Sequence, residues 1–246
     1  MRFAFSLAKA DLPRLGLIVL QADETIEGDF RRMIPATTEW LVTRVPSGEE
    51  LTADSIRAME AHLGAAAGRL PRGGAFDAVA YACTSGAAGI GTARVASMVR
   101  DGVNARAVSD PVTALLAACG ALGITRLGLL SPYVAEVSDR LRQVLAEAGV
   151  ETPVFGSFEE EIEARVVRID APSICNAAET LAARGGIDAL FLSCTNLRTL
   201  EVIAPLEARL GLPVLSSNQV LAWHMLRLAG VADAPGIPGR LARVAG

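Results

Sequence analysis

Two of the four cysteines stand in the same local context, one in which a thiol can do chemistry. Cys83 and Cys194 each end an aliphatic run and are each followed by a threonine. Such runs are typical of buried parallel strands, and ligands bind beyond the carboxyl ends of these strands. If a helix begins after each cysteine, its free N–H groups can hold a substrate carboxylate and lower the thiol pKa. Two thiols on opposite sides of one molecule could remove and return a proton, which supports racemisation without a cofactor.

The alternative for any one strand-end cysteine is an inert core residue. The matching Cys-Thr context of the two sites reduces the weight of that interpretation. Cys119 and Cys175 lie on Ala-rich stretches, and we interpret them as packing residues on helices. His62 and His224 are the only histidines, and no Cys-x-x-Cys spacing occurs, so we expect no structural zinc site.

The two cysteines belong to a longer internal repeat. Three pairs of segments correspond in order, at a spacing of about 110 residues: 14–17 with 126–129, 77–84 with 188–195, and 110–124 with 217–231. The sequence therefore predicts two copies of one α/β unit.

Each copy has the pattern of strands alternating with helices. We expect strands at 15–20, 41–45, 75–83, 105–109, 127–132, 152–155, 187–194 and 211–215. We expect helices at 49–68, 134–148 and 172–184, the first two occupying equivalent places in the repeat. The predicted fold is α/β, with two similar Rossmann-like units whose parallel sheets are related by a pseudo-twofold axis. The units would span 1–110 and 111–216, with 217–246 packing back on the first and the active site in the cleft between them.

The composition excludes several classes of protein. The 246 residues carry a net charge of −4 and are 51% hydrophobic, which suits a large core and excludes global disorder. Without a basic block or an apolar run of roughly 20 residues, we expect neither a nucleic-acid partner nor a membrane span. The first 13 residues are too mixed for a signal peptide, so we expect a cytoplasmic protein with free thiols. The glycine run at 86–91 lacks the order G-x-G-x-x-G, and we expect no cofactor.

The segments around the two cysteines, ACTSGAAGIG (82–91) and SCTNLRTLEVIAPLEARLGLPVLSSNQ (193–219), resemble the aspartate/glutamate racemase superfamily. The resemblance covers most of the chain, from GLIVLQADETIEGDFRRMIP (16–35) to SSNQVLAWHML (216–226). Within the superfamily, the chain resembles the branch that contains maleate cis–trans isomerase and arylmalonate decarboxylase. Two stretches, GLIVLQADETIEGDFRRMIP (16–35) and ALFLSCTNLRTLEVI (189–203), look most like the ectoine-utilisation proteins.

The resemblance implies roles for particular residues. Cys83 and Cys194 match the two catalytic cysteines of the family, whereas the decarboxylases have glycine at the first position. The resemblance implies that Thr84, Ser85, Thr195 and Tyr133 hold a substrate carboxylate. We predict Asp23 and Asn196 as further substrate-binding residues.

The chain also departs from its relatives. Asp23 stands where maleate isomerases carry an asparagine. If Asp23 faces the substrate, its charge would repel a second substrate carboxylate or attract an ammonium group. The alternative is that Asp23 is an ordinary turn or cap residue. Asn196 follows the second Cys-Thr, where glutamate racemases have histidine. The region 161–169 lacks the asparagine of the family's loop, so we expect the contact that it makes with substrate to be lost here.

We therefore expect a cofactor-independent isomerase or racemase of a small carboxylate or amino-acid-like substrate, acting in ectoine breakdown. The alternatives are maleate isomerase proper, an arylmalonate-type decarboxylase, and a carboxylate-binding protein without turnover. We expect no metal and a homo-oligomer, a dimer or a tetramer.

Overall fold

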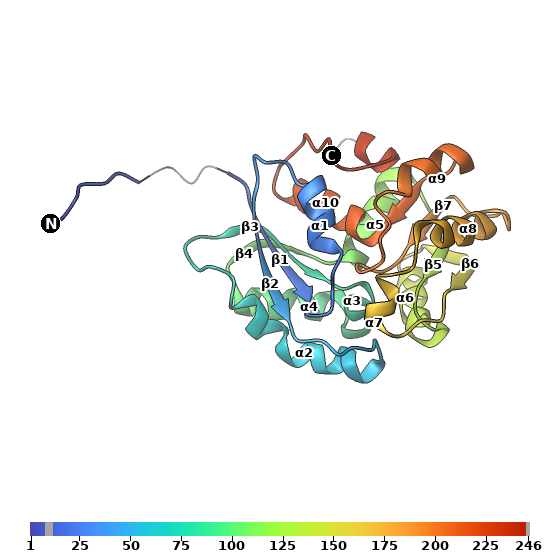
Figure 1. Cartoon of the computed structure of the whole chain (residues 1–246), viewed down its shortest axis with the longest axis horizontal. Helices are drawn as coiled ribbons and strands as arrows, with labels where there is room; N and C mark the ends of the chain where they lie inside the picture. Colours follow the sequence, from blue (N-terminus) through green and yellow to red (C-terminus); the bar gives the residue numbers. More distant parts are fainter. Residues whose placement is uncertain (8–11, 245–246) are drawn as a thin grey trace.

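The structure is a computed structural model, and it describes residues 1–7 and 12–244. It contains two four-stranded sheets in which every strand pair is parallel (Figure 1). The first sheet has the order β2-β1-β3-β4 and consists of β1 (Arg14–Leu20), β2 (Glu39–Val45), β3 (Phe76–Ala82) and β4 (Ala105–Ser109). The second has the order β6-β5-β7-β8 and consists of β5 (Arg126–Ser131), β6 (Glu151–Ser157), β7 (Ala189–Leu192) and β8 (Val214–Ser216). The identical order confirms the predicted α/β fold of two similar units.

Helices cover both faces of the sheets. They are α1 (Ile26–Met33), α2 (Ala53–Ala67), α3 (Thr84–Ile90), α4 (Thr92–Gly102), α5 (Pro111–Leu122), α6 (Ala135–Glu147), α7 (Glu163–Val166), α8 (Ala171–Ala182), α9 (Ile203–Leu210) and α10 (Ser217–Leu228), with a 3₁₀ turn at Arg240–Arg243. On the first sheet, α2 packs against α4, and α1 packs against α10 on the other side (Figure 1). Helix α10 follows the second sheet, yet it contacts α5, β3 and α1.

The predicted equivalence of the first two helices is wrong. Helix α2 joins β2 to β3, so its counterpart is α8, which joins β6 to β7. The counterpart of α6 is α1, which joins β1 to β2. The sequence prediction missed α1 because it has only eight residues, four of them charged, although Ile26, Phe30 and Met33 lie on its buried face.

The repeated segments have the same structural role in both units. The backbone N–H of Arg14 donates to the Asp77 carboxylate at 2.8 Å, and that of Arg126 donates to the Asp188 carboxylate at 2.9 Å. Asp77 lies at the start of β3 and binds the neighbouring strand β1. Asp188 directly precedes β7 and binds the neighbouring strand β5. This contact explains why the two sequence signatures recur together.

Local sequence also determines where the helices near the cleft begin. Asp110 accepts hydrogen bonds from the first turn of α5, and Pro111 occupies a first-turn position that needs no donor. Ser216 and Gln219 form a reciprocal capping box at the start of α10. The box fixes the position of Ser217, which faces the candidate site.

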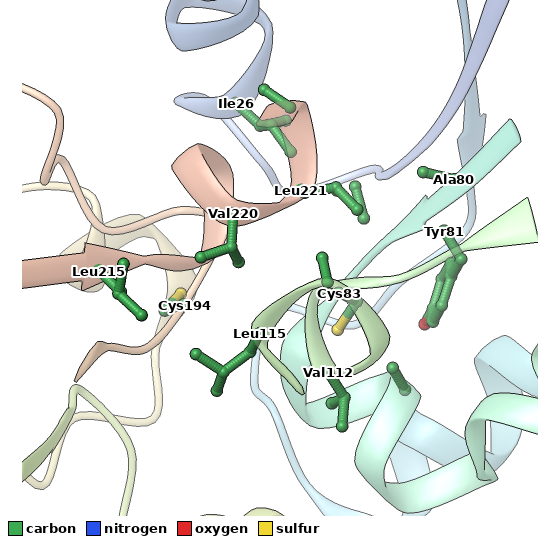
Figure 2. Packing of buried hydrophobic residues seen from close by; sticks show 14 of the residues in the cluster. Ile26, Ala80, Tyr81, Cys83, Val112, Leu115, Cys194, Leu215, Val220 and Leu221 are labelled. Atoms are coloured by element: carbon green, nitrogen blue, oxygen red, sulfur yellow. The ribbon is translucent and has the colours of Figure 1, made fainter. Parts of the chain in front are cut away.

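One hydrophobic core runs through both units. Figure 2 shows Cys83 and Cys194 within it, together with Val220 and Leu221 of α10 and Leu115 of α5. Among the described residues, no helix is long and apolar enough to cross a membrane. The same part of the chain has no group of three or more residues suited to hold a metal ion.

Candidate active site

A narrow cavity lies beyond the carboxyl ends of β1, β3, β5 and β7. It is lined by Leu20, Asp23, Leu51, Cys83, Thr84, Ser85, Tyr133, Glu163, Cys194, Thr195 and Asn196. Every site residue that the sequence predicted belongs to this set. The sequence prediction missed Leu20, Leu51 and Glu163. The cavity has space for about one water molecule, so a substrate can enter only when part of the lining moves.

Cys83 follows β3 and is the N-cap residue of α3, which begins at Thr84. Its sulfur accepts a hydrogen bond from the backbone N–H of Gly86 at 3.2 Å. A side chain at position 86 would collide with this sulfur and with the Tyr81 hydroxyl, so glycine is required there. The expected helix start after the first cysteine is therefore present.

Cys194 follows β7, but no helix begins there, which corrects the prediction; α9 starts only at Ile203. The carbonyl oxygen of Thr195 accepts from the Asn218 side chain at 2.8 Å, and that of Asn196 accepts from the Thr25 hydroxyl at 2.9 Å. Because distant side chains occupy these carbonyls, the segment forms a loop. Cys194 has φ 121°, a conformation that residues other than glycine rarely adopt.

Ser217 connects the two cysteine segments. Its hydroxyl accepts a hydrogen bond from the backbone N–H of Cys194 at 3.0 Å and lies 2.8 Å from the Thr84 hydroxyl. Sequence reasoning did not single out this serine, because a serine at a helix start is ordinarily a cap. In the fold it holds the strained Cys194 backbone next to the segment that carries Cys83.

Tyr133, Glu163 and Asn196 form a buried hydrogen-bond network beside Cys194. The Tyr133 hydroxyl donates to Glu163 Oε1 at 2.6 Å and lies 3.0 Å from the Cys194 sulfur. Asn196 Nδ2 donates to Glu163 Oε2 at 2.7 Å. Burial raises the pKa of Glu163, while these two donors lower it. Tyr133 thus contacts a carboxylate of the protein itself.

Asp23 combines the two roles that the sequence left open. One carboxylate oxygen, Oδ1, accepts from the backbone N–H groups of Thr25 and Ile26 at 2.8 and 2.9 Å and caps α1. The other oxygen, Oδ2, is buried without a hydrogen-bond partner among the described residues, and the side chain lines the cavity. Burial raises the pKa of Asp23.

The thiol pKa values shift in the direction opposite to the prediction. Burial raises the pKa of Cys83 to about 12 and that of Cys194 well above its ordinary value. The negative charges of Glu163 and Asp23 act in the same direction. The N–H of Gly86 lowers the pKa of Cys83, but the loss of hydration outweighs that one donor. Both cysteines are therefore neutral thiols at neutral pH.

Two segments from opposite units meet over the cavity. Residues 49–51 and 161–163 form a short antiparallel contact, in which Leu51 N donates to Glu161 O at 3.3 Å and Glu163 N donates to Glu49 O at 3.0 Å. This contact, which we call the clasp, carries Leu51 and Glu163 to the cavity. Neither segment has a strand pattern, and Glu163 follows an acidic run, so the sequence offers no signal for it.

The remaining candidates lie elsewhere, as the sequence suggested. Cys119 is buried in α5 and Cys175 is half-buried in α8, and neither lines the cavity. His224 pairs with Ser109, with 2.8 Å between Nδ1 and the hydroxyl oxygen. His62 is exposed on α2.

Two Rossmann-like units with cysteines at equivalent strand ends define a class of α/β enzyme, and comparison with known proteins agrees. The chain belongs to the arylmalonate decarboxylase family, which it matches over residues 15–242. It is 27% identical over 240 residues to arylmalonate decarboxylase of Bordetella bronchiseptica, covering 91% of this chain and 93% of that protein. It is 22% identical to maleate isomerase of Geobacillus stearothermophilus, covering 87% and 90%.

The solved structures give the same picture of the fold. The maleate cis–trans isomerase of Nocardia farcinica, in a cysteine-to-serine mutant with a covalently bound succinylcysteine intermediate, superposes with a TM-score of 0.84. The two sequences are 24% identical, and the match covers 96% of this chain and all of that one (100%). These comparisons confirm the predicted branch and establish the chain as an enzyme of this family.

Proposed function

We propose that this enzyme is a cofactor-independent isomerase or racemase of a small carboxylate, with Cys83 and Cys194 as its two reacting groups. The observation that carries the proposal is that both thiols line one buried cavity from equivalent strand ends of the two units. A one-base enzyme has no need of a second buried thiol at the matching place.

In the acid–base form of the mechanism, one cysteine as thiolate takes the proton from the carbon next to the substrate carboxylate. The C–H electron pair moves into a planar enediolate, and the other thiol gives its proton to the opposite face of that carbon. The first cysteine ends as a thiol, the second as a thiolate, and the stereocentre is inverted. The hydroxyls of Thr84, Ser85 and Thr195 are available to hold the carboxylate and the charge that develops on it.

In the nucleophilic form, a thiolate adds to a carbon–carbon double bond and the other thiol supplies a proton to the neighbouring carbon. Rotation about the new single bond and loss of the same proton and thiolate give the geometric isomer. The succinylcysteine intermediate in the Nocardia farcinica enzyme supports this form as maleate isomerisation proper.

A decarboxylase is the second candidate, because the matched family and the Bordetella bronchiseptica relative carry that name. The presence of Cys83 speaks against it, since the resemblance places a glycine there in decarboxylases.

The test is incubation of the protein with a panel of small carboxylates in deuterium oxide, followed by proton NMR. Racemisation predicts deuterium at the carbon next to the carboxylate, and cis–trans isomerisation predicts a fumarate-type product. Release of carbon dioxide would instead identify a decarboxylase. A binding protein gives none of these signals. Cys119→Ala is the matched control, because this buried cysteine does not line the cavity.

The finer assignments stay predictions. Action in ectoine breakdown rests only on the phrases at 16–35 and 189–203. Cytoplasmic location and a dimeric or tetrameric state rest on composition and on the family resemblance.

A further inference from the structure

The cavity contains two buried carboxyl groups beside the two thiols. Asp23 and Glu163 are each 4% exposed, and both line the cavity. Among the described residues of the lining, none is lysine, arginine or histidine. A substrate with two carboxylates would therefore bring its second negative charge to two acidic side chains with no cation to offset it.

In the described part of the chain, one carboxylate oxygen of Asp23 lacks a hydrogen-bond donor at the cavity. Asp23 Oδ1 caps α1, whereas Oδ2 has no hydrogen-bond partner among the described residues. The Thr195 hydroxyl has one proton: it lowers the pKa of Asp23 as a hydrogen-bond partner, and it also lies 3.4 Å from the Ala82 carbonyl oxygen, so at most this one shared donor reaches the carboxyl. A buried acceptor without a donor is costly, and a bound ligand is one way to satisfy it.

The nearest cation does not supply that donor. The Arg44 guanidinium donates to the backbone oxygens of Leu20 and Asp23, at 2.9 and 3.0 Å, and pairs with the Glu27 carboxylate. It does not line the cavity. The free oxygen of Asp23 is thus left for a group that enters from the cavity.

Glu163 adds a second acidic group to the same space. Tyr133 and Asn196 each donate to one of its oxygens, which fixes the carboxylate but leaves further acceptor positions. The charge of Asp23 raises the pKa of Glu163, which indicates that the two carboxyls are close enough to interact.

We propose that the substrate of this site is a zwitterion: a small carboxylate that also carries a cationic nitrogen, an ammonium or amidinium group, which binds between Asp23 and Glu163. This inference rests on the proposed function, in which the hydroxyls of Thr84, Ser85 and Thr195 hold the substrate carboxylate. The cation completes the hydrogen bonding of Asp23 and balances the negative charge of both acids.

The same cation would help to activate a thiol. The carboxyls of Glu163 and Asp23 contribute to the raised pKa of Cys83 and Cys194. A positive charge bound between these acids opposes that contribution and favours the thiolate. The cationic group of the substrate would then supply part of the activation of the thiol.

The test uses three acids with the same four-carbon chain: 4-aminobutyrate, butyrate and succinate. Their binding to the wild-type protein and to Asp23→Asn is measured by titration calorimetry at neutral pH. Asparagine is a good helix cap, so this variant keeps the first turn of α1 while it removes the charge. Asp23→Ser, which also keeps a capping oxygen, serves as the second variant. Asp110→Asn is the matched control, because Asp110 is a buried aspartate that caps α5 outside the cavity.

The wild-type protein should bind 4-aminobutyrate at least about tenfold more tightly than butyrate, and succinate more weakly than either. Asp23→Asn and Asp23→Ser should lose that preference and gain affinity for succinate, whereas Asp110→Asn should keep the wild-type order. Tightest binding of succinate, unchanged binding of 4-aminobutyrate by both Asp23 variants, or no binding of 4-aminobutyrate would overturn the proposal.

The outcome is separable from that of the proposed function. If zwitterions bind in the expected order but no carboxylate in the panel is converted, the proposed catalysis fails and the assignment of the acidic pair stands. If the wild-type protein turns over dicarboxylates and no zwitterion, the acidic pair has been misassigned and the proposed catalysis stands.

Discussion

The Tyr133 hydroxyl contacts both Glu163 and Cys194, so its removal tests the buried hydrogen-bond network. It donates to Glu163 at 2.6 Å and lies 3.0 Å from the Cys194 sulfur. Tyr133→Phe removes only this oxygen, since the buried ring can keep its packing. Leaving a buried acceptor unpaired costs about 1–3 kcal/mol of unfolding free energy. For a chain of this length that is a fall in Tm of about 2–12 °C.

The same substitution should lower activity. When Cys194 ionises, the Tyr133 hydroxyl can turn its one proton from Glu163 to the sulfur, and this donation lowers the pKa of Cys194. Loss of the hydroxyl therefore leaves less thiolate at a given pH. Loss of one such hydrogen bond corresponds to a decrease in kcat/KM of about ten- to a hundredfold. The pH profile of kcat/KM should also move to higher pH.

A double-mutant cycle with Glu163→Gln separates the network from simple packing. Thermal and urea unfolding of the wild type, both single variants and the double variant give the coupling energy between the two side chains. We expect a coupling of about 1 kcal/mol or more, because the partners are in direct contact. Additive effects within about 0.5 kcal/mol, together with unchanged kinetics for Tyr133→Phe, would refute this account of the tyrosine.

Three further results follow from the geometry. Cys83→Ala and Cys194→Ala should each lower turnover by about 10²–10⁴ in the deuterium assay, whereas Cys119→Ala should change stability only. Burial raises the pKa of Asp29 from 3.8 to about 6, so the native state holds a proton that the unfolded state releases. The contribution of Asp29 to stability should therefore fall as pH rises from about 4 to 6, and urea unfolding of Asp29→Asn should show a shallower slope over this range than the wild type. Ser217→Ala should cost about 1–3 kcal/mol in the same unfolding assay, because the buried N–H of Cys194 loses its acceptor.

Local patterns were enough to predict the two sheets and the repeat. Aliphatic runs gave the strands within a few residues, and 105–109 coincides with β4. The paired aspartates Asp77 and Asp188 helped to make the repeat visible because each binds the backbone of the neighbouring strand in its own unit. The order of the helices was harder, since the repeat is clear in the strands and faint in α1, which has only eight residues.

The site was predicted where it depends on strand ends and missed where it depends on contacts between the units. Cys83 and Cys194 follow strands, so alternation of elements was sufficient to bring them to one cleft. Glu163 reaches the cavity only through the clasp, and an acidic residue after an acidic run ordinarily predicts a solvated surface. No local pattern could assign it to a buried site.

The wrong prediction of lowered pKa values for Cys83 and Cys194 has the same physical origin. The prediction of a lowered pKa considered one favourable element, a helix start, whereas burial is set by everything that closes over the sulfur. Leu51 and Glu163, both brought by the clasp, exclude water and add a negative charge next to the thiols. Enclosure and charge thus act together to keep Cys83 and Cys194 protonated until a ligand arrives. The contacts of the clasp therefore both enclose the cavity and set the negative charge beside the thiols.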